Sequence, residues 1–233
     1  MSAQSMAPRK RHASNVDVDD VVLARALRFS AWARANVTAI IVALVLVALA
    51  VGYAFYYHYH SVQRKTDAAT AFVKLDATVS SGNTALAARD LGTFIQHYDG
   101  TVYAEQARIE LAQIQMEAGK PKEAVAALRG ADQRIDDSPV GAQAALVLAA
   151  AQAASGDRNG AIQTYLKVAD DAELDFRKVD ALTNAADLQE QAGDYKAAAA
   201  LYQRLVEMTA KGTPENSLYG MRAAEATAKA RAK

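Results

Sequence analysis

Four glycines recur at an interval of 37 residues in this chain, and the residues that follow them recur at the same interval. An alanine stands five residues after each glycine, and a leucine or a tyrosine stands nine residues after it. A fixed period between about 20 and 50 residues is typical of stacked repeat proteins, which present long surfaces to partners. The period therefore favours a binding function over a catalytic one. The three sets are Gly82, Gly119, Gly156 and Gly193; Ala87, Ala124, Ala161 and Ala198; and Leu91, Leu128, Tyr165 and Tyr202.

Each 37-residue unit is predicted to form two helices. A glycine suits the left-handed position that follows a helix, so the chain should turn at each of the four glycines. In the last unit, we expect one helix to end at Ala192 and the next to begin near Lys196. Pro121 falls in the first turn of a predicted helix, where the missing N–H group costs little, and Pro139 and Pro214 lie between units. The sequence therefore predicts an all-α protein.

Composition excludes several classes of function. The chain has no cysteine, so it can form neither disulfides nor thiolate metal sites. Acidic and basic residues are equal in number, 26 each, and residues 61–233 hold 20 basic and 23 acidic side chains. Nucleic-acid binding needs a basic face that neutralises phosphates, so this balance argues against a nucleic-acid partner.

Residues 37–57 contain no charged side chain. A helix of this length rises about 31 Å, which is enough to cross a hydrocarbon core of roughly 30 Å. Trp32 precedes the segment, and Tyr53, Tyr56 and Tyr57 close it, as amphipathic rings do at a headgroup layer. We therefore predict one transmembrane helix, with these four aromatic residues as its edges.

The basic residues of the N-terminal tail indicate the orientation. Short loops rich in lysine and arginine stay in the cytoplasm, so the repeats should lie on the other side of the membrane. This predicts a single-pass membrane protein with its repeat domain outside the cytoplasm; in a Gram-negative bacterium, the span would lie in the inner membrane and the repeats in the periplasm. Ala48-Leu49-Ala50 resembles a signal-peptide cleavage site, and cleavage there is the alternative, although the 36 preceding residues are long for a signal peptide.

Neither glycine nor proline occurs between Gly52 and Gly82, so the spanning helix can continue into the first repeat. A break at His60–Ser61 is the alternative, because a solvent-exposed helix gains little from packing there. Residues 20–36 could form an amphipathic helix that lies on the membrane surface, or they could extend the spanning helix into the cytoplasm. The predicted segments are a disordered cytoplasmic tail (1–19), a juxtamembrane amphipathic helix (20–36), the transmembrane helix (37–57), a helical stalk (58–70), the repeats (71–215) and a C-terminal capping helix (216–233).

Two stretches resemble the tetratricopeptide repeat: LVLAAAQAASGDRNGAIQTYLKVA at residues 146–169 and LTNAADLQEQAGDYKAAAALYQRLV at residues 182–206. In each, small residues precede a Gly-Asp pair, and an alanine and a tyrosine follow it. The usual period of that family is 34, so each unit here has three extra residues. The family's tryptophan is absent, and the first unit carries Lys74 where a leucine is expected. The resemblance implies an α-solenoid of about four helix pairs that ends in the capping helix.

On that resemblance, the first helix of each unit should line the concave surface of the array. An apolar groove with glutamines suits an extended or helical peptide, and the surface should become acidic in the last unit. The alternative is that Ile109, Met116 and Leu146 belong to the core. The predicted partner-binding residues are Phe72, Val79, Gln106, Ile109, Gln113, Met116, Gln143 and Leu146. The same surface should also carry Asp76, Ala150, Asp180, Thr183, Asp187 and Glu190.

No residues form a predicted catalytic, cofactor or metal site. His58 and His60 point away from each other on a helix, so they cannot both bind one metal ion. The carboxylates of Asp180, Asp187 and Glu190 have no histidine beside them and are interpreted as solvated. We find no glycine-rich phosphate loop in the sequence. We therefore expect a non-enzymatic protein without a cofactor.

The layout of residues 25–230 is similar to that of the YfgM-like proteins, which are ancillary subunits of the bacterial SecYEG translocon. The shared features are a short basic tail, one span and a small alanine-rich repeat array. The resemblance implies a scaffold whose protein partners are the translocon, periplasmic chaperones or nascent secreted chains. Two alternatives remain: a structural or assembly subunit of another inner-membrane complex, and an enzyme, for which no catalytic constellation is found.

Overall fold

The computed structural model of the protein describes Arg25, Leu27, Trp32 and residues 34–80, 82–136 and 140–232. All regular structure in these residues is helical, which confirms the predicted all-α class. The chain divides into two compact units, residues 1–61 and residues 62–233. Most of the predicted juxtamembrane helix and Pro139 lie outside the described residues.

Helix α2 spans Val37–Val79 and contains the predicted transmembrane segment. Among the described residues, it is the one helix that is long and apolar enough to cross a membrane. Leu44 and Leu49 expose 63% and 65% of their surface, and other apolar side chains of this segment are also exposed, so none of the described residues covers the segment. Such a long exposed apolar stretch fits a hydrocarbon environment rather than water. The helix continues through His60 and Ser61, the place of the alternative break.

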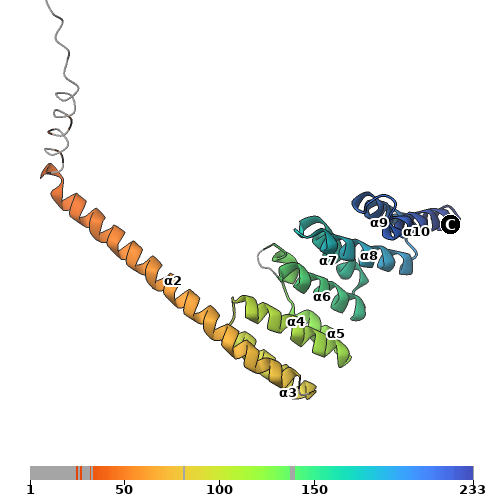
Figure 1. Cartoon of the computed structure of the whole chain (residues 1–233), viewed down its shortest axis with the longest axis horizontal. Helices are drawn as coiled ribbons and strands as arrows, with labels where there is room; N and C mark the ends of the chain where they lie inside the picture. The colour runs from red at the N-terminus through yellow and green to blue at the C-terminus, as the bar shows by residue number, and fades with distance from the viewer. Residues whose placement is uncertain are drawn as a thin grey trace, which may run out of the picture. The chain divides into compact units, whose positions relative to one another are not determined.

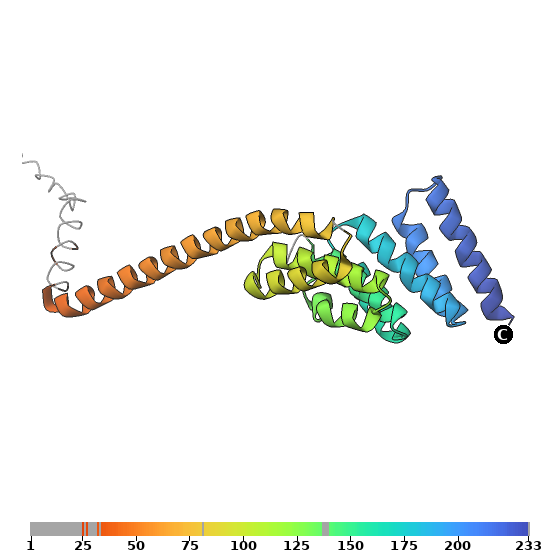
Figure 2. The same ribbon diagram turned by 90° about the horizontal axis from the view of Figure 1, so that it is seen from below.

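The second unit is a row of helix pairs (Figures 1 and 2). The C-terminal part of α2 pairs with α3, and each later pair packs against the next, with α10 against α9 at the end. Four pairs and a terminal helix confirm the predicted solenoid. The elements are α3 (Thr84–His97), α4 (Val102–Glu117), α5 (Pro121–Ala127), the short 3-10 helix η1 (Ala131–Gln133), α6 (Gly141–Ala154), α7 (Arg158–Asp171), α8 (Asp175–Gln191), α9 (Tyr195–Met208) and α10 (Pro214–Arg231).

The turns inside the pairs repeat the same hydrogen bonds. Gly156 has a φ of +92°, and its N–H donates to the carbonyl of Ala153, while the N–H of Asp157 donates to the carbonyl of Gln152. These two bonds close the end of α6 in the geometry known as the Schellman motif. The Asp157 side chain then accepts from the N–H of Gly160 and caps α7. The same bonds recur around Gly193, with Asp194 as the cap, so the period of 37 encodes one helix–turn–helix unit.

Replacing Gly156 by valine is expected to lower the free energy of unfolding by about 1–3 kcal/mol, because a β-branched residue is strained at positive φ. Thermal unfolding followed by circular dichroism measures the change. Gly156→Asn is the matched control and should cost less, because asparagine tolerates the left-handed region. Equal melting temperatures for the valine variant and the wild type would contradict this turn geometry.

The second pair departs from the others. Helix α5 ends at Ala127, and Gly130, with a φ of +77°, precedes the short helix η1. Ala131, which occupies the same repeat position as Val168, therefore lies in η1 and not in a continuous second helix. It remains buried there, so the interruption preserves the apolar contact while shortening the helix.

Alanine makes the close packing of the array possible. Ala149 of α6 and Ala161 of α7 are both fully buried in one cluster with Tyr165 and Leu182. Two further clusters fill the second pair and the first pair. Small side chains let the helix axes approach, and the larger side chains of the next helix fill the space between them.

Candidate functional site

An open groove of about 510 Å³ runs across the first helices of three successive pairs, α4, α6 and α8. Its wall is apolar at Met116, Leu146 and Val147, and the ring of Tyr165 from α7 contributes to it. Amide and charged side chains complete the lining. The lining residues are Gln113, Met116, Glu117, Gln143, Leu146, Val147, Ala150, Tyr165, Arg177, Asp180 and Asn184.

Four of the predicted partner-binding residues line this groove. Gln113 and Met116 come from α4, and Gln143 and Leu146 come from α6, one helical turn apart in each helix. Residues three or four positions apart lie on the same helix face, so the two helices present an amide and an apolar side chain each. Ala150, also expected on this surface, continues the α6 face by one more turn.

The prediction for Ile109 is wrong, because this side chain has no exposed surface and lies in the apolar cluster of the second pair. Phe72 and Val79 pack in the cluster of the first pair, where the Phe72 ring lies 5.6 Å from that of Phe94 and 5.8 Å from that of Tyr103. Gln106 is half-buried and its amide donates to Glu110. These four residues lie outside the groove lining because the neighbouring helices cover the α2 and α4 faces that carry them. The Asp76 side chain is outside the described residues.

On α8, the residues that line the groove differ from the predicted ones except at Asp180. The lining residues of α8 are Arg177, Asp180 and Asn184, whereas Thr183 donates to the carbonyl of Val179. Arg177 lies three residues before Asp180 and Asn184 lies four residues after it, so helical spacing from Asp180 identifies both positions. The predicted acidic end of the groove is therefore mixed in charge.

Arg177 is held in place at this end of the groove. Its guanidinium donates to the side-chain carbonyl of Gln143 at 3.3 Å, which bridges α8 and α6, and it lies 5.0 Å from the centre of the Phe176 ring. Because arginine offers five donors in a planar group, the remaining N–H groups can donate to a carbonyl or carboxylate in the groove.

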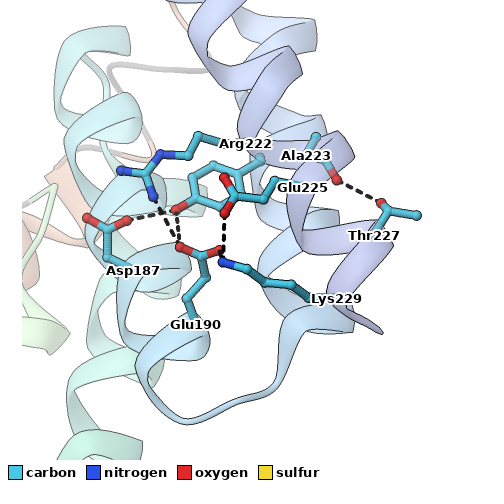
Figure 3. A network of polar contacts seen from close by, with 8 residues as sticks. Asp187, Glu190, Arg222, Ala223, Glu225, Thr227 and Lys229 are labelled. Carbon is cyan, nitrogen blue, oxygen red and sulfur yellow. Dashed lines mark hydrogen bonds and ion pairs between the residues drawn. The ribbon is translucent and has the colours of Figure 1, made fainter. Parts of the chain in front are cut away.

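Asp187 and Glu190 do not line the groove but anchor the terminal helix, as Figure 3 shows. The Tyr202 hydroxyl of α9 donates to Asp187 at 2.7 Å, and Arg222 of α10 donates to Glu190 at 3.1 Å. Lys229 of α10 lies 3.9 Å from Glu190 and 2.8 Å from Glu225. The Glu190 side chain is only 15% exposed, so its interpretation as a solvated carboxylate is wrong. This cluster holds α8, α9 and α10 together.

No group of three or more histidine, cysteine, aspartate and glutamate side chains could hold a metal ion in the part of the chain that the structure describes. The His60 ring packs at 4.5 Å against that of Tyr56 and contacts Tyr59 at its edge. These contacts lie within a belt of aromatic side chains that follows the apolar segment. The arrangement suits an interfacial residue.

A sequence-family model described as a tetratricopeptide repeat-like domain matches residues 30–219. This range covers most of the chain and all four helix pairs. No curated protein and no solved structure matches the chain.

Proposed function

The chain belongs to the tetratricopeptide repeat-like domain family, and we propose on this basis that it is a membrane-anchored scaffold whose groove binds a segment of a partner protein. Repeat domains of this kind are typically interaction modules without enzymatic activity. The proposal assigns membrane attachment to residues 37–57 and partner binding to the face made by α4, α6 and α8.

The observation that carries the proposal is the composition of the groove. The groove lining combines the apolar side chains of Met116, Leu146 and Val147 with the amides of Gln113, Gln143 and Asn184. An extended peptide has the matching pattern, because its side chains can enter apolar sites while its backbone N–H and C=O groups bond to amides. This combination of apolar and amide groups favours a protein segment over a purely apolar ligand.

The exposed apolar part of α2 supports membrane attachment, and the basic tail supports a cytoplasmic N-terminus with the repeats in the periplasm. The resemblance of the layout to YfgM-like proteins supports a finer proposal. On that proposal, the chain is an ancillary subunit of the Sec translocon that brings periplasmic chaperones to emerging secreted chains. The alternative is a subunit of another inner-membrane complex. In that case the transmembrane helix would make the main contact with the partner, and the groove would not bind it.

Met116→Glu is expected to lower recovery of the partner about tenfold, which corresponds to about 1.4 kcal/mol, because it places a charge in the apolar wall. The measurement is affinity purification of the full chain from native membranes in mild detergent, followed by mass spectrometry of the co-purifying proteins. Met208→Glu is the matched control, since Met208 is also partly exposed but lies on α9 outside the groove. It should leave recovery unchanged.

The identity of the recovered proteins tests the finer proposal. Channel subunits and periplasmic chaperones, both recovered with the wild type, would support the translocon role. Loss of the chaperones alone in Met116→Glu would assign them to the groove and the channel to the span. Equal recovery of every partner with both variants would contradict a groove function and favour the alternative. Ile109→Glu serves as an unfolding control, because that side chain is fully buried.

A further inference from the structure

The break in the second helix pair lies beside a hollow of about 370 Å³, the α5 hollow, between α5, η1 and α6. Helix α5 ends after seven residues, whereas α3, α7 and α9 each have 14. The segment from Gly130 through η1 follows the shortened helix and forms one wall of the hollow. The hollow therefore lies at the irregular feature that distinguishes this pair from the others.

The α5 hollow lies on the opposite face of α6 from the groove. Helix α6 contributes Leu148 and Gln152 to the hollow, and it contributes Leu146 and Ala150 to the groove. Residues two positions apart on a helix point in directions about 200° apart. A ligand in the α5 hollow therefore leaves the groove free.

Two cations lie on one face of α5 beside the hollow. Lys122 and Arg129 are seven residues apart, which is close to two helical turns, and both are exposed. Neither side chain forms a hydrogen bond or an ion pair with another of the described residues. Glu123 follows Lys122 directly but lies about 100° further around the helix, and it does not line the hollow.

The carboxylates at the α5 hollow already have basic partners. Asp132, the acidic residue of the lining, lies 3.7 Å from Lys167 of α7. A neighbouring hollow that shares Asp132 also contains Asp170, which accepts from Arg204 at 2.8 Å. Among the lining residues that the structure describes, the unmatched charge is therefore positive, and it favours an anionic group.

The uncharged part of the lining suits a protein segment. Val125 and the buried Leu148 give the hollow an apolar floor. The side-chain carbonyl of Gln152 accepts from the Thr164 hydroxyl at 2.8 Å, so the N–H groups of this amide remain to donate to a ligand. An acidic side chain between apolar ones matches both the cations and the floor. Inorganic phosphate matches only the cations, and nucleic acid needs a larger basic face.

We propose that the α5 hollow is a second protein-binding site, and that it takes a segment in which a carboxylate side chain lies between apolar side chains. Lys122 and Arg129 bind the carboxylate, and Val125 and Leu148 contact the apolar side chains. The α5 hollow and the groove share no lining residue, so this inference does not depend on the function proposed for the groove.

The probe for this site is a short fluorescein-labelled peptide in which Leu and Asp alternate. A matched peptide carries Asn in place of every Asp, which removes the charge and keeps the shape. Fluorescence anisotropy measures the dissociation constant of each peptide with the full chain in mild detergent. We expect the Asp peptide to bind about tenfold more tightly, because charge-assisted hydrogen bonds are the stronger ones. Equal affinity for the two peptides would overturn the proposal.

A double variant tests the two cations. Lys122→Gln combined with Arg129→Gln should weaken binding of the Asp peptide about tenfold and abolish its advantage over the Asn peptide. The matched control is Arg158→Gln combined with Lys211→Gln, which removes the same two kinds of charge at exposed positions outside the hollow. The control should keep the wild-type affinity. An equal loss in both double variants would show a general charge effect and contradict the site.

The apolar contact and the location are tested separately. Ala126 lines the hollow and is exposed, so the side chain of Ala126→Trp can fill the hollow without entering the core. This variant should weaken binding of both peptides, whereas Met116→Glu should weaken neither. Loss of binding in Met116→Glu with normal binding in the Lys122 and Arg129 double variant would place the peptide in the groove and refute the proposal. Displacement of the Asp peptide by an equal concentration of inorganic phosphate would show a general anion site and would also refute it.

Discussion

Tyr202→Ala is expected to lower the free energy of unfolding of the last two helix pairs by about 3–5 kcal/mol, the range for removing a large aromatic side chain from a core. Tyr202 is 1% exposed and is among the largest fully buried side chains of the described residues. Its ring packs between α8 and α10, and its hydroxyl donates to Asp187. Thermal unfolding of the full chain in detergent, followed by circular dichroism, measures the loss.

Tyr202→Phe separates the hydroxyl from the ring. It keeps the packing but leaves Asp187 without its 2.7 Å donor, so the expected loss is about 1–3 kcal/mol. A matched control is Tyr195→Phe, since Tyr195 lies on the same helix and is less buried. Equal stability of Tyr202→Phe and the wild type would show that the hydroxyl contributes nothing to the anchoring of α10.

The same hydroxyl gives the array a pH dependence. Burial raises the pKa of Tyr202 above its ordinary value of 10.0, and the hydrogen bond to Asp187 and the charges of Asp187 and Glu190 raise the pKa further. In the unfolded chain the pKa returns to the ordinary value. The contribution to stability is therefore complete below pH 10.0 and is lost as the pH rises toward the folded pKa.

The difference in melting temperature between the wild type and Tyr202→Phe should therefore be constant from about pH 8 to about pH 10 and shrink above it. Burial also raises the pKa of Tyr165, but both proteins keep that residue, so its effect cancels in the difference. A difference that stays constant or grows above pH 10.0 would contradict the folded environment of Tyr202.

Gly141→Ala is expected to lower the free energy of unfolding by about 1–3 kcal/mol, because a side chain there overpacks a closed site. Gly141 is buried at the start of α6. An added Cβ would lie 2.7 Å from the carbonyl oxygen of Ile135 and would also press against that of Arg134. Both obstacles are backbone atoms, so relief requires a shift of the segment between η1 and α6.

Gly92→Ala is the control for the glycine substitution itself. Gly92 lies inside α3, and nothing stands within 4 Å of a Cβ built there. Alanine favours the helix over glycine, so this variant should gain about 0.5–1 kcal/mol. Opposite signs for the two variants in thermal unfolding would confirm the close approach at Gly141. A gain for both would contradict it.

The helix pairs and their turns could be predicted because their signals are local. A positive φ at Gly156 and the cap by Asp157 involve hydrogen bonds between residues at most a few positions apart. The same local logic placed Pro121 at the first position of α5. The charge-free stretch before Tyr57 likewise needs no tertiary contact to be recognised as apolar.

The face that each helix turns to the core could be predicted only in part. Met116 and Ile109 are seven residues apart on α4 and share nearly the same face by periodicity. One lines the groove and the other is fully buried, because α5 and α6 cover the middle of α4 more completely than its end. Burial depends on how far the neighbouring helices reach, and no spacing within α4 contains that information.

The sequence alone therefore determined the repeat unit, its helical caps and the apolar segment, since each depends on neighbours along the chain. Tertiary structure decided which side chains reach the groove, and it paired Glu190 with Arg222 over a separation of 32 residues. It also decided that Gly141 must be a glycine, because carbonyl oxygens of a preceding turn occupy the space of its side chain. These properties arise from the packing of separate elements, and the free energy of that packing depends on distances that only the folded chain sets.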